Sequence, residues 1–563
     1  MTEKLAIGIA PDSSYSAQVL SQLGVPFVAV ENLKEAVAAG VRVFFRNPLN
    51  REDDAWRPAA GQRVAIITHH AGVRSGGSEN EGREVRSYSF RLPQGSPFEA
   101  RSFFVNLPIA SAAGESVGAC HDLEGKEIPN SGIAIAKSAG RLVVSLPWNV
   151  FAYRQGAQWE HRPYYCPALE KHFVEISPLL DTGAFRRLLL EILLVCFDWV
   201  RLPLVRVSPF CRNKKYFSFR IDADGFTESS TQASLRVAER TGLRFTWFLD
   251  MARWKGHGQW ITRLEERGQD VQLHCYRHMT YASQEVNGVN LKKGLAHLRQ
   301  NGVTPNAVVS PLGYAYQGFA DAIKELGFVY SSEFGYAVDD LPSHPQNDPA
   351  RPLQIPAHPG CSGALKRAGF TGQEQFRHLR DQVERACRSD GICILYDHPN
   401  GGVEKHESEY VRLFTELMKD SYEYVCMSDY YRFWLARPEN PTLSYDEGRI
   451  EGDAFPHNGF RIEQVASGTV GAARCGGAEL PQASLPASSD HYPNPPRSLQ
   501  EIADKSDRVH LWQRNSTPCW WRLNELCLEL LAKLGYFRCR QYLAQVKWLR
   551  TWVRALRGRA QYR

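Results

Sequence analysis

Two carboxylates stand one residue apart at the end of an apolar run that begins at Phe217. Asp222 and Asp224 follow residues typical of a β-strand, and Gly225 comes directly after them. Carboxylates placed in this way can divide the chemistry, one binding a metal ion while the other stays free as a base. Asp-x-Asp-Gly is also an ordinary turn sequence, so this motif does not identify a site by itself.

Two histidines four residues apart follow a second apolar run, 271–273. His274 and His278 lie on one face if the second begins a helix, and both imidazoles then reach one cation. With Asp224 they form an Asp-His-His set that leaves positions open for water and substrate, as catalytic zinc sites require. Two solvent-facing histidines are the competing interpretation.

Two further apolar runs end in sequences suited to catalysis. Asp397 and His398 follow the run 392–396, where a carboxylate can poise an imidazole. The competing interpretation is a capping aspartate beside an exposed histidine. The run ending at Val309 leads into Ser-Pro-Leu-Gly, a rigid turn able to aim a backbone N–H inward.

The elements that must position these residues form a regular alternation. Between 216 and 434, short apolar runs alternate with helical patterns, which predicts a complete or distorted (β/α) barrel over residues 206–436. In such barrels the active residues lie at the carboxyl ends of strands, the positions that these motifs occupy. The expected strands are 216–221, 244–248, 271–274, 307–310, 328–331, 353–355, 392–396 and 424–427.

Residues 1–205 show a similar alternation. Expected strands at 5–10, 26–30, 41–45, 64–68 and 142–146, with helices at 14–23, 33–39 and 183–200, predict a doubly wound α/β domain with a parallel sheet. No phosphate-binding glycine fingerprint follows the first strand. The sequence does not reveal the role of this domain, and a packing or oligomerisation module is the plainest interpretation.

Residues 437–563 do not show the alternation of strands and helices that is typical of a barrel. We expect a small β-rich appendage at 437–480, a Pro/Ser linker at 481–500 and a basic amphipathic helical tail at 501–563. From Arg514 onward there are eleven Lys and Arg residues against two Asp and Glu. Such a tail lies either on an anionic membrane surface or on the enzyme's own body. Nucleic acid is disfavoured, because no recognised binding motif accompanies the charge.

The length, the hydrophobic and charged content and the cysteine usage of the chain indicate what class of protein it is. A chain of 563 residues exceeds what one core usually supports, and 43% hydrophobic with 23% charged residues is typical of soluble proteins. Thirteen cysteines without a CxxC pair fit a reducing compartment. The N-terminal stretch lacks a long apolar segment with a cleavage site. These features predict a cytoplasmic protein, with a peripheral position on the inner membrane if the tail binds lipid.

The stretch from about 216 to 434 resembles the polysaccharide-deacetylase, or NodB-homology, family of carbohydrate esterases. Arg220-Ile-Asp222-Ala-Asp224-Gly225 is similar to the family's TFDDG motif in its one-residue-spaced form. The HxxxH motif is matched in full. Tyr396-Asp397-His398 is similar to the LxH motif, and the 309–313 stretch matches RxPxG in part.

This resemblance implies a distorted barrel, a divalent ion that we expect to be Zn²⁺, and hydrolytic N-deacetylation of amino sugars. It makes Asp222 the base and Asp224 a metal ligand beside the two histidines. His398 becomes the general acid. The backbone N–H of Leu312, together with the metal, would stabilise the oxyanion.

The chain departs from the family in two places. Val309 stands where the family's arginine braces the base; Arg220, on the same strand face as Asp222, or Arg277 could substitute. The Asp-Trp motif is absent, and Ser331-Ser-Glu333-Phe334 lies nearest to its expected position. His358 is expected to be a packing residue at a turn.

Three functions therefore remain open. The first is deacetylation of an amino-sugar carbohydrate in bacterial surface polysaccharide biosynthesis. The second is metal-dependent hydrolysis of a non-sugar amide or cyclic imide. The third is a non-catalytic barrel that serves as a scaffold.

Overall fold

The computed structural model describes residues 206–436, the expected barrel, almost continuously and the N-terminal part in segments. The expected linker, except 482–483, and the expected tail lie outside the described residues. The described ranges are 3–11, 14–46, 55–69, 87–91, 97–100, 116–121, 127, 132–146, 159–166, 169–178, 182–207, 215–313, 316–334, 341–345, 348–388, 391–437, 442–446, 449–452, 462–465, 474–475, 478–479 and 482–483.

The N-terminal sheet is parallel through five of its seven strands. Its order is β3-β2-β4-β5-β11-β10-β8, and only β10 and β8 join in antiparallel fashion. The five strands expected from the sequence are the five parallel ones. The bounds are β2 Ile7–Ile9, β3 Phe27–Ala29, β4 Val43–Phe45, β5 Val64–His69, β8 Ser116–Val117, β10 Ile133–Ser138 and β11 Arg141–Leu146.

Helices cover both faces of this sheet because its strands are apolar on both sides. In β4, Val43 and Phe45 pack against α1 (Ser14–Leu23) and α4 (Thr182–Val200). Phe44 points to the opposite face and packs against α2 (Leu33–Ala38). Continuous apolar strands of this kind are typical of parallel sheets buried between helices.

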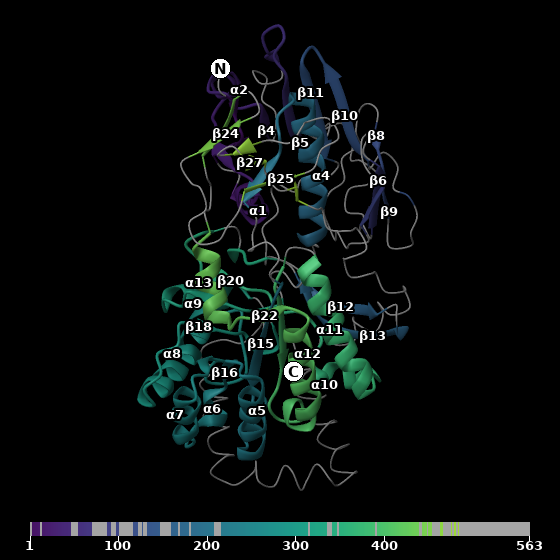
Figure 1. Cartoon of the computed structure of the whole chain (residues 1–563). Coiled ribbons are helices and arrows are strands. Elements are labelled where there is room, and N and C mark those ends of the chain that lie inside the picture. Colours follow the sequence, from purple (N-terminus) through teal and green to yellow (C-terminus); the bar gives the residue numbers. More distant parts are fainter. Residues whose placement is uncertain are drawn as a thin grey trace.

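Segments distant in sequence complete the two halves of the molecule (Figure 1). Strands from the expected appendage pair with N-terminal elements, β23 (Leu443–Asp446) with β1 (Glu3–Lys4) and β25 (Ile462–Val465) with β14 (Val205–Val207). The hairpin of β12 (Trp159–Cys166) and β13 (Lys171–Pro178) lies instead beside the barrel, where Tyr164 and Phe173 enter its core. The other small strands are β6 Ser87–Arg91, β7 Pro97–Ala100, β9 Ala119–His121, β24 Arg449–Gly452, β26 Arg474–Cys475, β27 Ala478–Glu479 and β28 Gln482–Ala483.

The second half is built on a curled parallel sheet in the order β20-β19-β18-β17-β16-β15-β21, with β22 also paired to β15. All of these pairings are parallel. The bounds are β15 Lys215–Ala223, β16 Thr246–Leu249, β17 Asp270–Leu273, β18 Ala307–Val308, β19 Tyr330–Ser331, β20 Leu353–Gln354, β21 Cys393–Asp397 and β22 Tyr422–Tyr424.

Alternation along β15 sets its polar residues on one face. Phe217, Phe219 and Ile221 pack outward against the helices. Ser218, Arg220 and Asp222 have the opposite parity, are also buried, and therefore face the interior of the curled sheet. The helices around the sheet are α5 Glu228–Thr241, α6 Met251–Trp254, α7 Gly258–Glu266, α8 Gln284–Gln300, α9 Gln317–Glu325, α10 Ser362–Arg367, α11 Gly372–Arg388, α12 Glu407–Lys419 and α13 Met427–Leu435.

His358 joins the two edges of the curled sheet, after the chain has left β20. Its backbone N–H donates to the Ile394 carbonyl at 3.0 Å, and its Nδ1 accepts the Ile394 N–H at 3.1 Å. Burial lowers the pKa of His358 to about 4, so the ring stays neutral and its Nδ1 stays an acceptor. The histidine expected to pack at a turn therefore also bridges the sheet edges.

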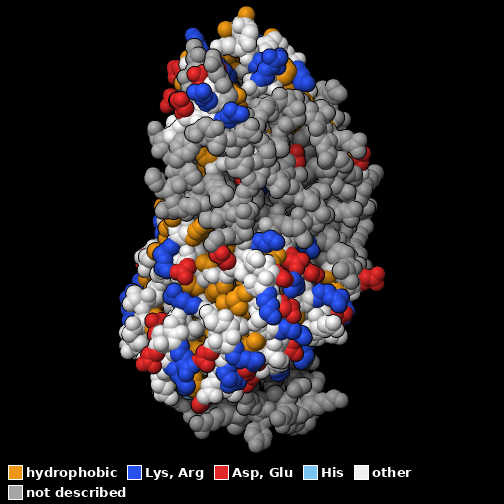
Figure 2. Space-filling view, viewed as in Figure 1, with side chains coloured by type: hydrophobic (Ala, Val, Ile, Leu, Met, Phe, Trp, Pro, Cys, Tyr) orange, Lys and Arg blue, Asp and Glu red, His pale blue; other side chains and the backbone are white. Residues whose placement is uncertain are grey.

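No helix among the described residues is long and apolar enough to span a bilayer. On the face shown in Figure 2, basic and acidic side chains are interspersed over the barrel.

Candidate metal centre and its surroundings

Asp224, His274 and His278 meet at the carboxyl ends of β15 and β17. Asp224 Oδ1 lies 3.0 Å from His274 Nε2 and 3.0 Å from His278 Nε2. The three ligand atoms lie within 4.8 Å of one another. The structure thus brings together the predicted Asp-His-His set.

The tautomer of His274 shows why this cluster suits a cation. Its Nδ1 lies 3.0 Å from the Val309 carbonyl oxygen, which can only accept, so Nδ1 carries the proton. In the neutral ring Nε2 then holds a lone pair that points at Asp224 Oδ1, a buried oxygen without a hydrogen-bond partner among the described residues. Two acceptors face each other, and a cation between them resolves the repulsion. A backbone carbonyl on the far ring nitrogen is the usual outer support of a metal-binding histidine.

Asp224 is held in its ionised form. Burial raises its pKa, but His278 and the charge of His398 outweigh burial and hold the pKa well below its ordinary value. The fit to a divalent cation therefore rests on the Asp224 carboxylate and on the two imidazoles of His274 and His278, each 3.0 Å from Asp224 Oδ1.

His278 does not begin a helix, which was the condition for placing both imidazoles on one helix face. Residues 274–283 form a loop in which Cys275 takes the left-handed backbone conformation, with φ +61°. Asn290 of α8 holds this loop: its Oδ1 accepts the Arg277 N–H at 2.9 Å, and its Nδ2 donates to the Arg277 and Met279 carbonyls. The buried Asn290 side chain, rather than the hydrogen bonds of a helix, therefore positions His278 beside Asp224 and His274.

Asp222 is braced from its own strand. Arg220 Nη2 donates to Asp222 Oδ2 at 2.9 Å, and its Nη1 donates to the carbonyl and the hydroxyl of Ser332, each at 2.7 Å. Arg277 instead lies over the Tyr276 ring, at 5.7 Å from its centroid. Asp222 Oδ1 has no hydrogen-bond partner among the described residues, so one oxygen of a buried carboxylate is available to accept a proton.

His398 stands between two carboxylates. Its Nε2 lies 3.4 Å from Asp224 Oδ2 and its Nδ1 lies 3.6 Å from Asp397 Oδ1. Burial lowers the pKa of His398, but Asp397, Cys361 and Asp224 outweigh burial and raise it well above the ordinary value. A histidine with a raised pKa carries a proton at neutral pH and can donate it.

The proline turn lies beside the metal-ligand cluster, because Val309 follows β18 and its carbonyl contacts His274. Leu312 has a φ of +62°, and Gly313 has a φ of +72° where a Cβ would come 2.3 Å from the Phe334 ring. The buried Glu333 carboxylate accepts the Ser310 N–H at 3.2 Å and the Ser331 hydroxyl at 2.8 Å. Glu333 therefore anchors the turn that carries the Leu312 N–H.

Sequence reasoning missed Asp250, which directly follows β16. It is buried, caps α6 by accepting the Ala252 N–H at 3.0 Å, and is close enough to His278 and Asp224 to feel their charges. Burial raises the pKa of Asp250 to about 7, opposed by His278 and Arg253. The rule that polar residues at strand ends form the site would have selected it.

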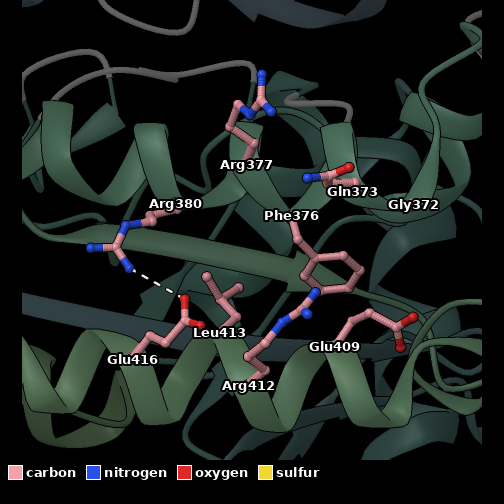
Figure 3. Close-up of a pocket in the computed structure, with 9 residues that line it drawn as sticks. All are labelled: Gly372, Gln373, Phe376, Arg377, Arg380, Glu409, Arg412, Leu413 and Glu416. Atoms are coloured by element: carbon pink, nitrogen blue, oxygen red, sulfur yellow. Dashed lines mark hydrogen bonds and ion pairs between the residues drawn. The ribbon is translucent and has the colours of Figure 1, made fainter.

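A groove of about 540 Å³ between α11 and α12 is separate from this cluster (Figure 3). Phe376 and Leu413 form its apolar floor, and Arg380 pairs with Glu416 across it. None of the predicted site residues lines this groove.

No family model matches the chain, and no curated protein does. Among solved structures, a putative polysaccharide deacetylase from Mycobacterium smegmatis is 16% identical, with 40% of this chain and 92% of that chain covered and a TM-score of 0.34. A CE4 family pseudoenzyme from Bacillus anthracis is 14% identical, with 39% and 66% covered and a TM-score of 0.30. Puue allantoinase is 16% identical, with 41% and 94% covered and a TM-score of 0.36. Similarities of this size do not decide function, which we infer from the side chains.

Proposed function

We propose that this protein is a metal-dependent hydrolase that removes an N-acetyl group from an amino-sugar carbohydrate. One observation carries the hydrolase proposal: the Nε2 lone pair of His274 faces the unpartnered Asp224 Oδ1 at 3.0 Å, with His278 Nε2 at the same distance. Asp224, His274 and His278 would hold the cation, and imidazole and carboxylate ligands suit Zn²⁺. When bound, the cation supplies Lewis-acid activation of water and of the amide carbonyl.

Asp222 accepts the proton of the attacking water. Its free Oδ1 is the acceptor, while Arg220 occupies Oδ2 and keeps the carboxylate oriented. Ser332 fixes the Arg220 guanidinium through two hydrogen bonds, so the group that orients the base is itself held in place. The resulting oxyanion is stabilised by the Leu312 N–H, whose turn is anchored through Glu333.

His398 donates a proton to the leaving amine. Its raised pKa and its position between Asp224 and Asp397 support this role. Asp397 is itself held by the backbone N–H groups of His398 and Ser362 and by the Tyr410 hydroxyl, so the carboxylate that orients the imidazole is fixed. Base and acid therefore stand on β15 and β21, two paired strands.

The carbohydrate part of the proposal is supported by the motif resemblance of residues 216–434. A hydrolase of a non-sugar amide or cyclic imide would use the same ligands, base and acid. A position in bacterial surface polysaccharide biosynthesis, in the cytoplasm, is part of this proposal and is supported by the cysteine content. A cytoplasmic position favours a small biosynthetic intermediate over a finished polymer.

The test combines metal analysis with acetate release. The full chain, purified without chelator, is expected to contain a divalent ion held by Asp224, His274 and His278. It is also expected to release acetate from at least one member of a panel of N-acetylated nucleotide sugars, lipid-linked sugars and glycan oligomers. Asp222→Asn is the matched control, since it should keep the ion and lose the reaction. Cleavage of cyclic imides or simple amides without acetate release would support the second enzyme class, and a metal-free, inactive chain would support the scaffold.

A further inference from the structure

A second group of possible ligands lies next to the first. Cys361, Asp397 and His398 offer a thiol, a carboxylate and an imidazole whose ligand atoms all lie within 4.8 Å of one another. Cys361 directly precedes α10, and Asp397 ends β21. His398 belongs to this group through Nδ1 and faces Asp224 of the first group through Nε2.

The separation of Asp397 and His398 does not correspond to a hydrogen bond. Nδ1 and Oδ1 are 3.6 Å apart, too far for a shared proton. Two ligands at about 2.0–2.1 Å from one tetrahedral cation are separated by roughly 3.3 Å, so a small movement would let both reach a common ion. The observed spacing is that of an ion pair when the ring is protonated, and a cation could take the place of the proton after a small movement.

Asp397 keeps a free lone pair on Oδ1, the oxygen that faces His398 Nδ1. Its Oδ2 accepts from the Ser362 N–H and the Tyr410 hydroxyl, which fills that oxygen. Its Oδ1 accepts only the backbone N–H of His398, at 2.7 Å, in the hydrogen bonds found among the described residues. A carboxylate oxygen has two lone pairs, so Oδ1 has one left for a metal ion.

The Cys361 sulfur completes the set. It accepts the Ala364 N–H at 3.4 Å, a contact that does not use the thiol proton. Loss of that proton on metal binding would leave this contact intact. A thiolate, an imidazole and a carboxylate together select Zn²⁺ over Mg²⁺ or Ca²⁺, which prefer oxygen alone.

We propose that Cys361, Asp397 and His398 bind a second Zn²⁺ ion, and that its binding inhibits the enzyme by withdrawing His398 from acid catalysis. The thiol releases its proton on binding. His398 uses its Nδ1 lone pair for the metal and no longer forms the imidazolium that donates a proton to the amine. The inhibition rests on the proposed function of His398, whereas the binding does not.

Stoichiometry tests the binding without any substrate. Chelator-stripped full-length protein is titrated with Zn²⁺ against a competing indicator. The wild type should bind two ions per chain, Cys361→Ser should bind one, and Cys393→Ser, which removes a buried cysteine of β21 outside both groups, should bind two. Serine also caps helices well, so α10 should survive the exchange. One ion in the wild type, or two in Cys361→Ser, would overturn the proposal.

Cobalt substitution provides a measurement that needs no variant. When Co²⁺ is added to stripped wild-type protein, the second equivalent should produce a thiolate-to-metal charge-transfer band, and the first, bound by oxygen and nitrogen, should not. Two bound ions without such a band would show that Cys361 is not a ligand.

Activity then separates this proposal from the proposed function. A second equivalent of Zn²⁺ should lower acetate release by about 10²-fold, the lower end of what a general acid contributes, and Cys361→Ser should resist this loss. The cobalt band at two equivalents, with no acetate release even at one equivalent of Zn²⁺, would refute the deacetylase while retaining the second site. Full activity with two ions bound would refute the inhibition.

Discussion

The two parallel sheets of this chain are built alike and differ at the carboxyl ends of their strands. In the N-terminal sheet the strand ends are mostly apolar or small, as at Ile9 and Phe45. The exception is β5, where the buried Thr68 precedes the terminal His69. In the curled sheet the same positions hold Asp222 and, just beyond the strands, Asp224, His274 and His398. Both sheets bury apolar residues under helices, so burial alone does not distinguish them.

The difference is in what the buried polar groups do. Asp222, Asp224 and His274 each present an atom that the protein leaves without a full set of hydrogen bonds, which costs free energy unless a ligand compensates. A folded chain tolerates such groups where they serve chemistry. A parallel sheet thus supplies a common edge for a site, and the polar residues placed at that edge decide whether there is one.

The largest expected effect comes from removing a ligand. His274→Ala should lose the ion held by Asp224, His274 and His278 and bring hydrolysis to background, because a single imidazole and carboxylate remain at that site. The ion is measured by elemental analysis and the reaction by acetate release. Thr68→Ala is the control from the other sheet and should change neither; a similar loss in both variants would mean that the two edges do not differ in function.

The base gives the next largest effect. Asp222→Asn should keep the ion and lower kcat by about 10²–10⁴-fold, because it removes a proton acceptor and not a ligand. Arg220→Lys, which cannot span Ser332 and Asp222 with a planar fork, should lower kcat as well but by less. Loss of the ion in Asp222→Asn would move this residue from the base to the ligands.

Strand-end chemistry was the part that sequence could predict. Alternation fixed the inner face of β15, and hence Arg220 and Asp222, because strand parity follows directly from residue spacing. Residue types at the next strand ends then indicated His274 and His398. The short helices α6 and α10 were not expected, since four or six residues carry too little periodicity to detect.

The loop at His278 could not be predicted for a different reason. Helical spacing is a local signal, whereas the Arg277 N–H is taken by Asn290, thirteen residues away. Contacts from a side chain to a distant backbone group have no period in the sequence. The same holds for His358, whose bonds to Ile394 join two sheet edges through residues 36 positions apart.

Asn290 provides a smaller and more specific effect. Asn290→Ala removes three hydrogen bonds from the loop that carries His278, so the cation should bind about 10–100-fold more weakly, with most activity restored at saturating cation. Asn287, equally buried on the same helix, supports the loop near Tyr281 and Ser283 and is the matched control. An Asn287→Ala variant that weakens the cation as much would show that general loosening, rather than the placement of His278, is responsible.

The smallest expected effect is on stability and concerns Glu333, which anchors the turn inside the curled sheet. Burial raises its pKa from 4.5 to about 7, although Ser331 and Arg220 oppose the rise. Below pH 4.5 the carboxyl is protonated in both folded and unfolded chains, and stability is unaffected. As pH rises from 4.5 to 7, the unfolded chain releases the proton first, so folding loses about 3 kcal/mol of stability, and above pH 7 the loss is constant.

Glu333→Gln removes this titration, so the metal-free variant should gain stability relative to metal-free wild type between pH 5 and pH 8, as measured by urea unfolding. Hydrogen bonds lost by the amide shift the two curves by a constant amount and leave the pH-dependent difference readable. Glu416→Gln, at an exposed carboxyl on α12, should run parallel to wild type. If the stability of Glu333→Gln instead follows the same pH dependence as wild type, the Glu333 carboxyl ionises as easily in the folded chain as in the unfolded chain. Burying polar groups at the strand ends of the curled sheet would then cost less free energy than their unpartnered atoms indicate.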